Sequence, residues 1–254
     1  MHQIDINCDM GEGFGIYSTG NSIAMLDYVS SANIACGYHA GDPAVMHETV
    51  QAAIQKNVAI GAHPSFPDLQ GFGRRNMTLS PQEVFQVTLY QIGALAAFVI
   101  AGKGRLHHVK PHGALYNMAS VDRQLADAIA TAVAVYDPSL IVYGLAGSEL
   151  IIAAGKAGLR VAAEAFADRA YQANGLLCPR TQKGAVIDDS NEVERQVLSI
   201  VRDQSVTTAE GSSIQIKADT ICIHSDSLHA FEHVKGIHKK LKAENIILKA
   251  PAQK

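Results

Sequence analysis

The chain has 254 residues, of which 48% are hydrophobic and 18% charged, and its net charge at pH 7 is −3. These values indicate a globular protein rather than a disordered chain or a membrane protein. With 6% aromatic residues, no tryptophan and no excess of basic side chains, the composition argues against binding to nucleic acid or to anionic lipid.

Short apolar runs recur along the chain, and each ends abruptly in Gly, His, Asp, Asn or Glu before a helical pattern begins. Runs that are apolar almost throughout are typical of strands buried on both faces of a parallel sheet. The predicted strands begin near Ile4, Ala32, Val58, Leu106, Leu140, Arg160 and Thr220, and 246–248 is a candidate for an eighth.

Helix signals fill the intervals between these runs. Asp42-Pro43 opens one helix, and Ser80-Pro81-Gln82-Glu83 opens another with an N-cap serine, a proline at the first helical position and a capping-box glutamate. Apolar residues at helical spacing mark a third helix around 125–133 and a last helix around 228–241.

Strands that alternate with one-sided helices indicate a parallel sheet covered by helices. An open doubly wound sheet gathers its polar residues at one switch point, whereas here they follow almost every strand. We therefore expect one TIM-like (β/α) barrel domain over residues 1–254, of α/β class, with seven or eight mostly parallel strands. The stretch 165–219, with a hairpin near 209–212, is interpreted as an insertion that forms a lid or an interface.

The four cysteines form no Cys-x-x-Cys pair, and three lie in apolar runs, where a free thiol packs as a small hydrophobic side chain. We expect reduced thiols in a reducing compartment. The first residues lack the pattern of a signal peptide, and no apolar run approaches the roughly 18 residues of a transmembrane helix. The sequence predicts a soluble, cytoplasmic protein.

The first strand carries Asp5, Asn7 and Asp9 at alternate positions, and Glu12 follows in its exit loop. Side chains alternate along a strand, so the first three point to the same side. Burying carboxylates inside a barrel is costly unless they bind something or join a hydrogen-bond network. We place Asp9 at the mouth as a functional residue, and a structural network is the alternative, favoured for Asp5.

His39 and His63 end the second and third predicted strands and should converge beside Asp9. They could act as general acid and base, contact a substrate, ligate a divalent metal with Asp9, or be structural. Lys110 and His112 lie two residues apart at the fourth strand end and should point the same way. The lysine suits a cation for carboxylate or phosphate, or a base of lowered pKa, with His112 as a proton carrier.

Other charged residues occupy the remaining strand ends. Arginines on loops over a barrel mouth suit bidentate capture of carboxylate or phosphate, with solvated surface charge as the alternative. Glutamates there could orient a histidine, whereas His107 and His108, earlier in the fourth strand, are interpreted as structural. The arginines are Arg74, Arg75, Arg169 and Arg180, the glutamates are Glu149 and Glu164, and His224-Ser225-Asp226 ends the seventh strand.

Five blocks, at 5–12, 31–42, 61–68, 108–117 and 164–171, match in order the signature blocks of a known family. On these residues the sequence resembles the A subunit of the bacterial ATP-dependent 5-oxoprolinase, a family also called the lactam-utilisation proteins. One departure is Ser225, where the family motif has Gly between His and Asp.

The resemblance implies a barrel related to the glycoside hydrolase and deacetylase type. It also implies hydrolysis of 5-oxo-L-proline, a cyclic amide, to L-glutamate with ATP, together with partner subunits B and C. ATP with Mg²⁺ is expected on the resemblance alone, because the sequence contains no P-loop or dinucleotide motif. Asp9 with Glu12 would hold Mg²⁺ or water. The predicted catalytic residues are Asp9, His39, His63, Lys110 and His112, and the predicted substrate or phosphate contacts are Glu12, Arg74, Arg169 and His224.

Two other interpretations stay open. The chain could be a metal-dependent amidase or deacetylase that works alone, with Asp9, His39 and His63 as metal ligands and no ATP. It could also be a non-catalytic, substrate-binding subunit that needs its partners. The sequence is also compatible with a homo-oligomer.

Overall fold

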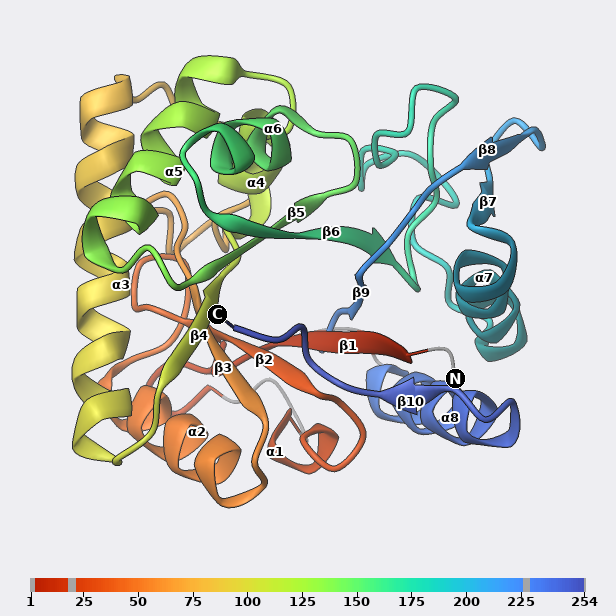
Figure 1. The fold of residues 1–254 in the computed structure, drawn as a ribbon, viewed down its shortest axis with the longest axis horizontal. Helices are drawn as coiled ribbons and strands as arrows, with labels where there is room; N and C mark the ends of the chain where they lie inside the picture. Colours follow the sequence, from red (N-terminus) through yellow and green to blue (C-terminus); the bar gives the residue numbers. More distant parts are fainter. Residues whose placement is uncertain (1–2, 18–21, 226–228, 254) are drawn as a thin grey trace.

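The computed structural model describes residues 3–17, 22–225 and 229–253. Seven parallel strands form a closed barrel, which confirms the predicted fold class (Figure 1). Strand β9 pairs with both β6 and β1, and this pairing closes the ring. The barrel strands are β1 (Gln3–Met10), β2 (Ser31–Ala35), β3 (Ala59–His63), β4 (Leu106–Val109), β5 (Ile141–Leu145), β6 (Arg160–Phe166) and β9 (Thr220–Ile223).

The candidate eighth run is a short strand, β10 (Ile247–Leu248), which pairs in parallel with the start of β1. The tail beyond it, residues 249–253, runs across the amino end of the barrel (Figure 1). There His107 Nε2 donates to the Pro251 carbonyl at 2.8 Å, and the Gln253 amide donates to the carbonyls of Leu106 and His107. The tail therefore covers the end opposite the predicted site.

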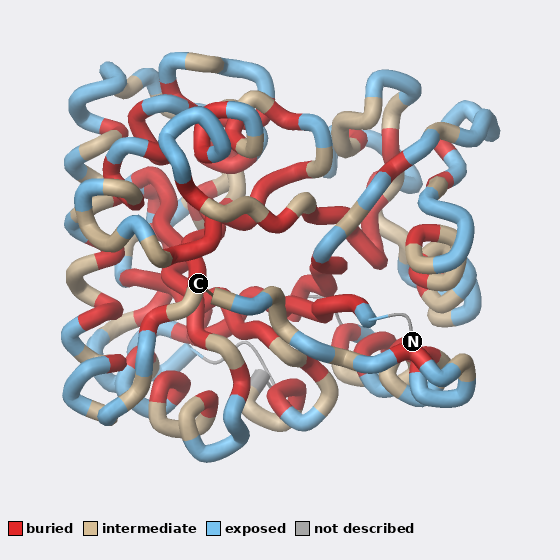
Figure 2. Tube along the Cα trace, viewed as in Figure 1, coloured by how far each residue is buried: buried red, intermediate tan, exposed pale blue. Residues whose placement is uncertain are grey.

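Helices surround the barrel and present exposed outer faces, whereas the barrel wall is buried (Figure 2). The predicted helix starts are confirmed: the Asp42 carboxylate accepts from the amides of Ala44 and Val45, and Ser80 forms a capping box with Glu83. The helices are α1 (Ser22–Met25), α2 (Pro43–Gln55), α3 (Pro81–Ala101), α4 (Gly113–Ala119), α5 (Arg123–Tyr136), α6 (Glu149–Lys156), α7 (Ser190–Asp203) and α8 (Ala230–Ala243).

Helix α3 is long and apolar enough, by length and composition, to span a membrane, with a mean hydropathy of 1.8. It packs on α5, α2 and the barrel, and Val84, Ile92 and Leu95 are fully buried in these contacts. A core helix of a soluble protein has the same composition, so we interpret α3 as part of the barrel's outer layer.

The predicted insertion contains α7 and an antiparallel hairpin of β7 (Ser205–Thr207) and β8 (Ser213–Gln215), as expected near 209–212. Both lie beside the barrel, next to β6 and β9 (Figure 1). Gln172 and residues 176–181 of this segment line a cavity at the barrel mouth. The role of the segment as a lid or an interface stays a prediction. The strand end expected at Asp226 and the helix start expected near Leu228 lie outside the described residues.

Candidate functional site

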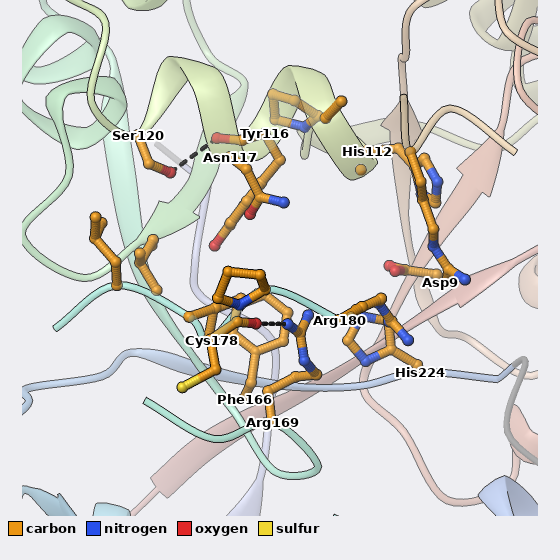
Figure 3. A pocket seen from close by; sticks show the side chains of 18 of the residues that line it. Asp9, His112, Tyr116, Asn117, Ser120, Phe166, Arg169, Cys178, Arg180 and His224 are labelled. Atoms are coloured by element: carbon orange, nitrogen blue, oxygen red, sulfur yellow. Dashed lines mark hydrogen bonds between the residues drawn. The ribbon is translucent and has the colours of Figure 1, made fainter. Parts of the chain in front are cut away.

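A cavity of about 480 Å³ opens at the carboxyl ends of the barrel strands. Asp9, His112 and His224 lie on one side of it, and Tyr116, Ser120 and Cys178 lie on the other (Figure 3). Polar strand ends therefore face a wall built by α4 and by residues 172–181. This is the position where barrels of this class carry their active sites.

Lys110 lies at the base of this cavity between two carboxylates. Its Nζ is 3.0 Å from Asp9 Oδ1 and 3.0 Å from Glu164 Oε1, and its side chain is only 3% exposed. Burial alone would lower the pKa of Lys110, but Asp9, Cys222 and Glu164 raise it well above its usual value. The two carboxylate contacts and the raised pKa favour a protonated Lys110 over a base with a lowered pKa.

Asp9 connects this cation to the rest of the site. Its Oδ1 also accepts from the Asn33 amide at 2.8 Å, and its Oδ2 is 3.4 Å from His63 Nε2. Burial opposes ionisation, yet His63 and Lys110 hold the pKa of Asp9 well below its usual value. The Asp9 carbonyl accepts from Ser225 Oγ at 2.6 Å, so the serine at the family's glycine position fastens the seventh strand end to the first.

A hydrogen-bond network fills the barrel below Lys110. Asn7 Nδ2 donates to Glu164 Oε1 at 2.8 Å, and His108 Nε2 is 2.8 Å from Asn33 Oδ1. Asp5 accepts from Ser30, Ser31 and Thr220, and burial raises its pKa despite these hydrogen bonds. These contacts match the structural interpretation of Asp5 and His108.

Three histidines and Glu12 form a second group, here called the histidine cluster (Glu12, His39, His63 and His112). One ligand atom of each lies within 4.8 Å of the others, and all four residues are buried. The His39 and His112 rings stack at 3.8 Å, and His112 Nδ1 is 2.9 Å from His63 Nε2. Burial, then the neighbouring histidines, hold the pKa of His39 and of His112 well below the usual value.

The loop after β3 shapes this cluster. Gly73 has a φ of +65°, and a Cβ there would lie 2.8 Å from His39 Cβ and 2.9 Å from His112 Cδ2. His112 Nε2 donates to the Phe72 carbonyl at 2.9 Å, and His63 Nδ1 donates to the Lys110 carbonyl at 2.7 Å. Glycine at position 73 thus lets the backbone approach the stacked rings and fix the His112 orientation.

His224 forms a separate pair with Asp168. Its Nδ1 is 2.9 Å from Asp168 Oδ1, and its ring stacks on Phe166 at 5.5 Å. Burial alone would raise the pKa of Asp168, but His224 holds it below its usual value. The carboxylate fixes the imidazole orientation, and His224 itself lines the cavity.

The arginines fall into two sets. Arg74, Arg169 and Arg180 line the cavity, whereas Arg75 pairs with Asp68 in the same loop. Arg169 is buried and donates to the carbonyls of Ala185 and Cys178, so it also anchors residues 172–181. Burial, then Arg180, lower its pKa to about 10. An arginine that is this poorly solvated is suited to binding an anion.

The structure thus brings eight of the predicted site residues to the described cavity or its wall, and Glu12 and His39 lie directly behind it in the histidine cluster. Glu149 instead pairs with Arg123 on the outer surface. Among the described residues, a second potential metal group consists of Asp9, Cys222 and His224. The metal ligand set predicted from the sequence, Asp9 with His39 and His63, stays a prediction. The cavity residues at the strand ends are Asp9, His63, Arg74, Lys110, His112, Arg169, Arg180 and His224.

Sequence reasoning missed several residues of the site. Asn33 joins Asp9 to His108, and its only signal was its place on an otherwise apolar strand. Tyr116, which lines the cavity from α4, and the apolar pair Leu176 and Leu177 gave no signal, because their placement depends on how α4 and the insertion fold over the mouth.

Comparisons with known proteins agree over the full chain. A model described as the LamB/YcsF family matches residues 4–254. The chain is 56% identical over 251 residues to the 5-oxoprolinase A subunit of Geobacillus kaustophilus, covering 99% of this chain and 98% of that protein. It is 52% identical over 246 residues to the 5-oxoprolinase A subunit of Bacillus subtilis, covering 97% and 96%. The crystal structure of a lactam utilization protein from Thermus thermophilus superposes with a TM-score of 0.92 at 45% identity, covering 98% of this chain and 100% of that chain.

Proposed function

The chain belongs to the LamB/YcsF family, and from this premise we propose that it is the A subunit of an ATP-dependent 5-oxoprolinase, a hydrolase of a cyclic amide. The observation that carries the proposal is the identity of more than half to relatives of that name over nearly their whole length. The expected reaction opens the lactam C–N bond of 5-oxo-L-proline with water, gives L-glutamate and is driven by ATP hydrolysis. Partner subunits B and C belong to the same proposal.

The cavity suits such a substrate. Its volume of about 480 Å³ holds a five-membered lactam with room for a phosphate beside it. Arg74, Arg169 and Arg180 line it and would bind the substrate carboxylate or a phosphate through charged hydrogen bonds. Leu176 and Leu177 give an apolar surface for the ring methylenes.

We assign roles to the groups around this cavity from their contacts. His224, with Nδ1 held by Asp168, is oriented to exchange a proton with the substrate. Lys110 and Asp9 supply a fixed pair of opposite charges at the base of the cavity, where charge develops on the lactam carbonyl or its phosphorylated form. His63 and His112 line the cavity and would position the attacking water.

Reconstitution with partner subunits tests the proposal. The chain is incubated with 5-oxo-L-proline, first alone and then with subunits B and C of a related bacterium, each with and without Mg-ATP, and glutamate is measured. We expect glutamate only when ATP and all three subunits are present. Glutamate formed by the chain alone without ATP would contradict the proposal. No glutamate in any mixture would also contradict it, provided that the related bacterium's own A subunit supports turnover in the same mixture.

The same experiment addresses a second candidate function. The histidine cluster could hold a metal ion, and this is a specific structural basis for a metal-dependent amidase or deacetylase that acts alone. That enzyme would work without ATP and would lose activity to a chelator. We also propose a cytoplasmic location, because all four cysteines are free thiols.

A further inference from the structure

The hydrogen bonds of His63 and His112 determine where their ring protons lie. His63 Nδ1 faces the Lys110 carbonyl at 2.7 Å, and His112 Nε2 faces the Phe72 carbonyl at 2.9 Å. A carbonyl oxygen only accepts, so both of these nitrogens carry hydrogen. In two neutral rings, His63 Nε2 and His112 Nδ1 are then both without hydrogen.

These two bare nitrogens lie only 2.9 Å apart. Two lone pairs facing each other at this distance repel unless a proton or a cation lies between or beside them. A shared proton would remove this repulsion by making one ring an imidazolium. A metal ion bound by both nitrogens would also remove it, and it would account for the other ligand atoms that lie within 4.8 Å of this pair.

Glu12 supplies a third donor at the same point, and His39 lies beside it. Glu12 Oε1 is 3.5 Å from His112 Nδ1 and 3.4 Å from His39 Nε2. The other nitrogen of His39, Nδ1, is buried without a hydrogen-bond partner in the described residues. Because the His39 and His112 rings are stacked with 7° between their planes, they cannot both bind one ion in the ring plane, and His39 Nε2 faces Glu12 instead.

We infer that the histidine cluster binds one divalent transition-metal ion, with His63 Nε2, His112 Nδ1 and Glu12 Oε1 as ligands. Two nitrogens about 2.05 Å from a tetrahedral ion are about 3.3 Å apart. The separations here are 2.9 Å between His63 Nε2 and His112 Nδ1 and 3.5 Å between His112 Nδ1 and Glu12 Oε1, so small side-chain movements are enough to surround an ion. Imidazole-rich sites with one carboxylate suit Zn²⁺ and similar ions, whereas Mg²⁺ takes oxygen ligands. The site therefore differs from a Mg²⁺ site that accompanies ATP.

The second group, Asp9, Cys222 and His224, is a poorer site. Lys110 Nζ already contacts Asp9 Oδ1 at 3.0 Å and Cys222 Sγ at 2.9 Å, so a cation is in place there. Burial, opposed by Lys110, raises the pKa of the Cys222 thiol well above its usual value, and a thiol must lose its proton to bind a metal. His224 Nδ1 is occupied by Asp168.

The ion would lie at the wall of the cavity, because His63 and His112 line it while Glu12 and His39 line a smaller pocket behind them. A Lewis acid there would face a bound carbonyl or water. The metal site does not depend on the proposed 5-oxoprolinase function, since it is argued from hydrogen bonds and distances of this chain alone. The two can therefore fail separately.

Zinc binding to the full chain tests the inference. The protein is stripped with a chelator and dialysed, and Zn²⁺ is titrated against a chromophoric competitor. We expect one Zn²⁺ per chain that a large excess of Mg²⁺ does not displace. His112→Gln and Glu12→Gln should each weaken binding at least tenfold, and Co²⁺ bound to the wild type should show a visible spectrum that both variants lose.

Two matched controls distinguish this site from other histidines. His224→Gln removes a member of the second group, and His47→Gln removes an exposed histidine of α2. Both should keep the wild-type affinity. Absence of tight Zn²⁺ binding to the wild type would overturn the inference. So would unchanged binding by folded His112→Gln and Glu12→Gln, or loss of binding in His224→Gln alone. The wild-type titration and Co²⁺ spectrum decide the matter even where a variant fails to fold.

Discussion

Replacing Lys110 with methionine removes the one cation that lies between Asp9 and Glu164 while keeping most of the side-chain volume. Lys110 Nζ is 3.0 Å from a carboxylate oxygen of each, and neither partner is more than 5% exposed. Removing one member of a buried ion pair costs about 3–5 kcal/mol, because the remaining charge is left without compensation. Domains of this kind are stable by about 5–15 kcal/mol, so we expect the variant to fold with a much lower free energy of unfolding.

A double-mutant cycle separates this effect from simple loss of packing. In the Lys110→Met background, Glu164→Gln removes one of the two uncompensated charges, although alone it breaks an ion pair. We therefore expect the double variant to be more stable than the sum of the single losses predicts, by about 1–3 kcal/mol. Urea denaturation followed by circular dichroism measures all four free energies of unfolding.

Turnover supplies the second measurement. Lys110→Met should lower ATP-dependent glutamate formation by the reconstituted complex at least about a hundredfold, the usual loss for a fixed charge at a reacting centre. The reasoning would be refuted if the free energy of unfolding of Lys110→Met lay within about 0.5 kcal/mol of the wild-type value. It would also be refuted if the losses caused by the two substitutions were additive. Either result would mean that Lys110 is not a buried cation between two ionised carboxylates.

Three further predictions concern other parts of the site. Gly73→Ala should lower the melting temperature more than Gly147→Ala, because both glycines have positive φ but only a Cβ at position 73 would meet the stacked histidines; equal losses would contradict this. His108 has a pKa well below its usual value, mainly through burial, so it stays neutral in the fold. The stabilisation that a neutral His108 gives the fold is complete above about pH 6.5 and is lost as pH falls. Between about pH 7.5 and 5.5, the free energy of unfolding of the wild type, measured in urea, should therefore fall by about 1.4 kcal/mol more than that of His108→Gln. Parallel pH profiles of the two proteins would contradict this expectation. Arg169→Lys should raise KM for 5-oxoproline about tenfold and speed proteolysis of 172–181, because the fork that anchors this segment is lost; an unchanged KM would count against it.

Much of the fold could be predicted from local signals. Each barrel strand is an apolar run with a polar exit, and helix starts such as Ser80 and Asp42 carry capping chemistry that works over three or four residues. Helix α4 was missed, because it is short and begins directly after Lys110-Pro111-His112 with no side-chain cap. The pairing of β10 with β1 depends on a contact between the two ends of the chain, which local patterns do not encode.

Many residues of the site could be predicted from the sequence, but the contacts between them could not. Alternation along β1 placed Asp5, Asn7 and Asp9 inside the barrel, and that placement needs only strand geometry. Whether Lys110 is a base or a cation could not be decided, because the answer depends on Glu164, which lies far away in the sequence and 3.0 Å away in space. Pairwise distances of this kind set pKa values, and a single sequence does not contain them.

Asp9 explains why the two halves of the site should act together. Its Oδ1 contacts Lys110 and Asn33 in the barrel interior, and its Oδ2 faces His63 in the histidine cluster at 3.4 Å. A cation bound by the cluster would attract the Asp9 carboxylate and weaken the ion pair between Asp9 and Lys110. A proton on one of the cluster histidines would act on the same ion pair in the same direction. The position of Lys110 relative to a bound substrate is then linked to what the cluster holds. Because one short carboxylate serves both groups, neither the ion pair nor the cluster can be altered without changing the electrostatic environment of the other.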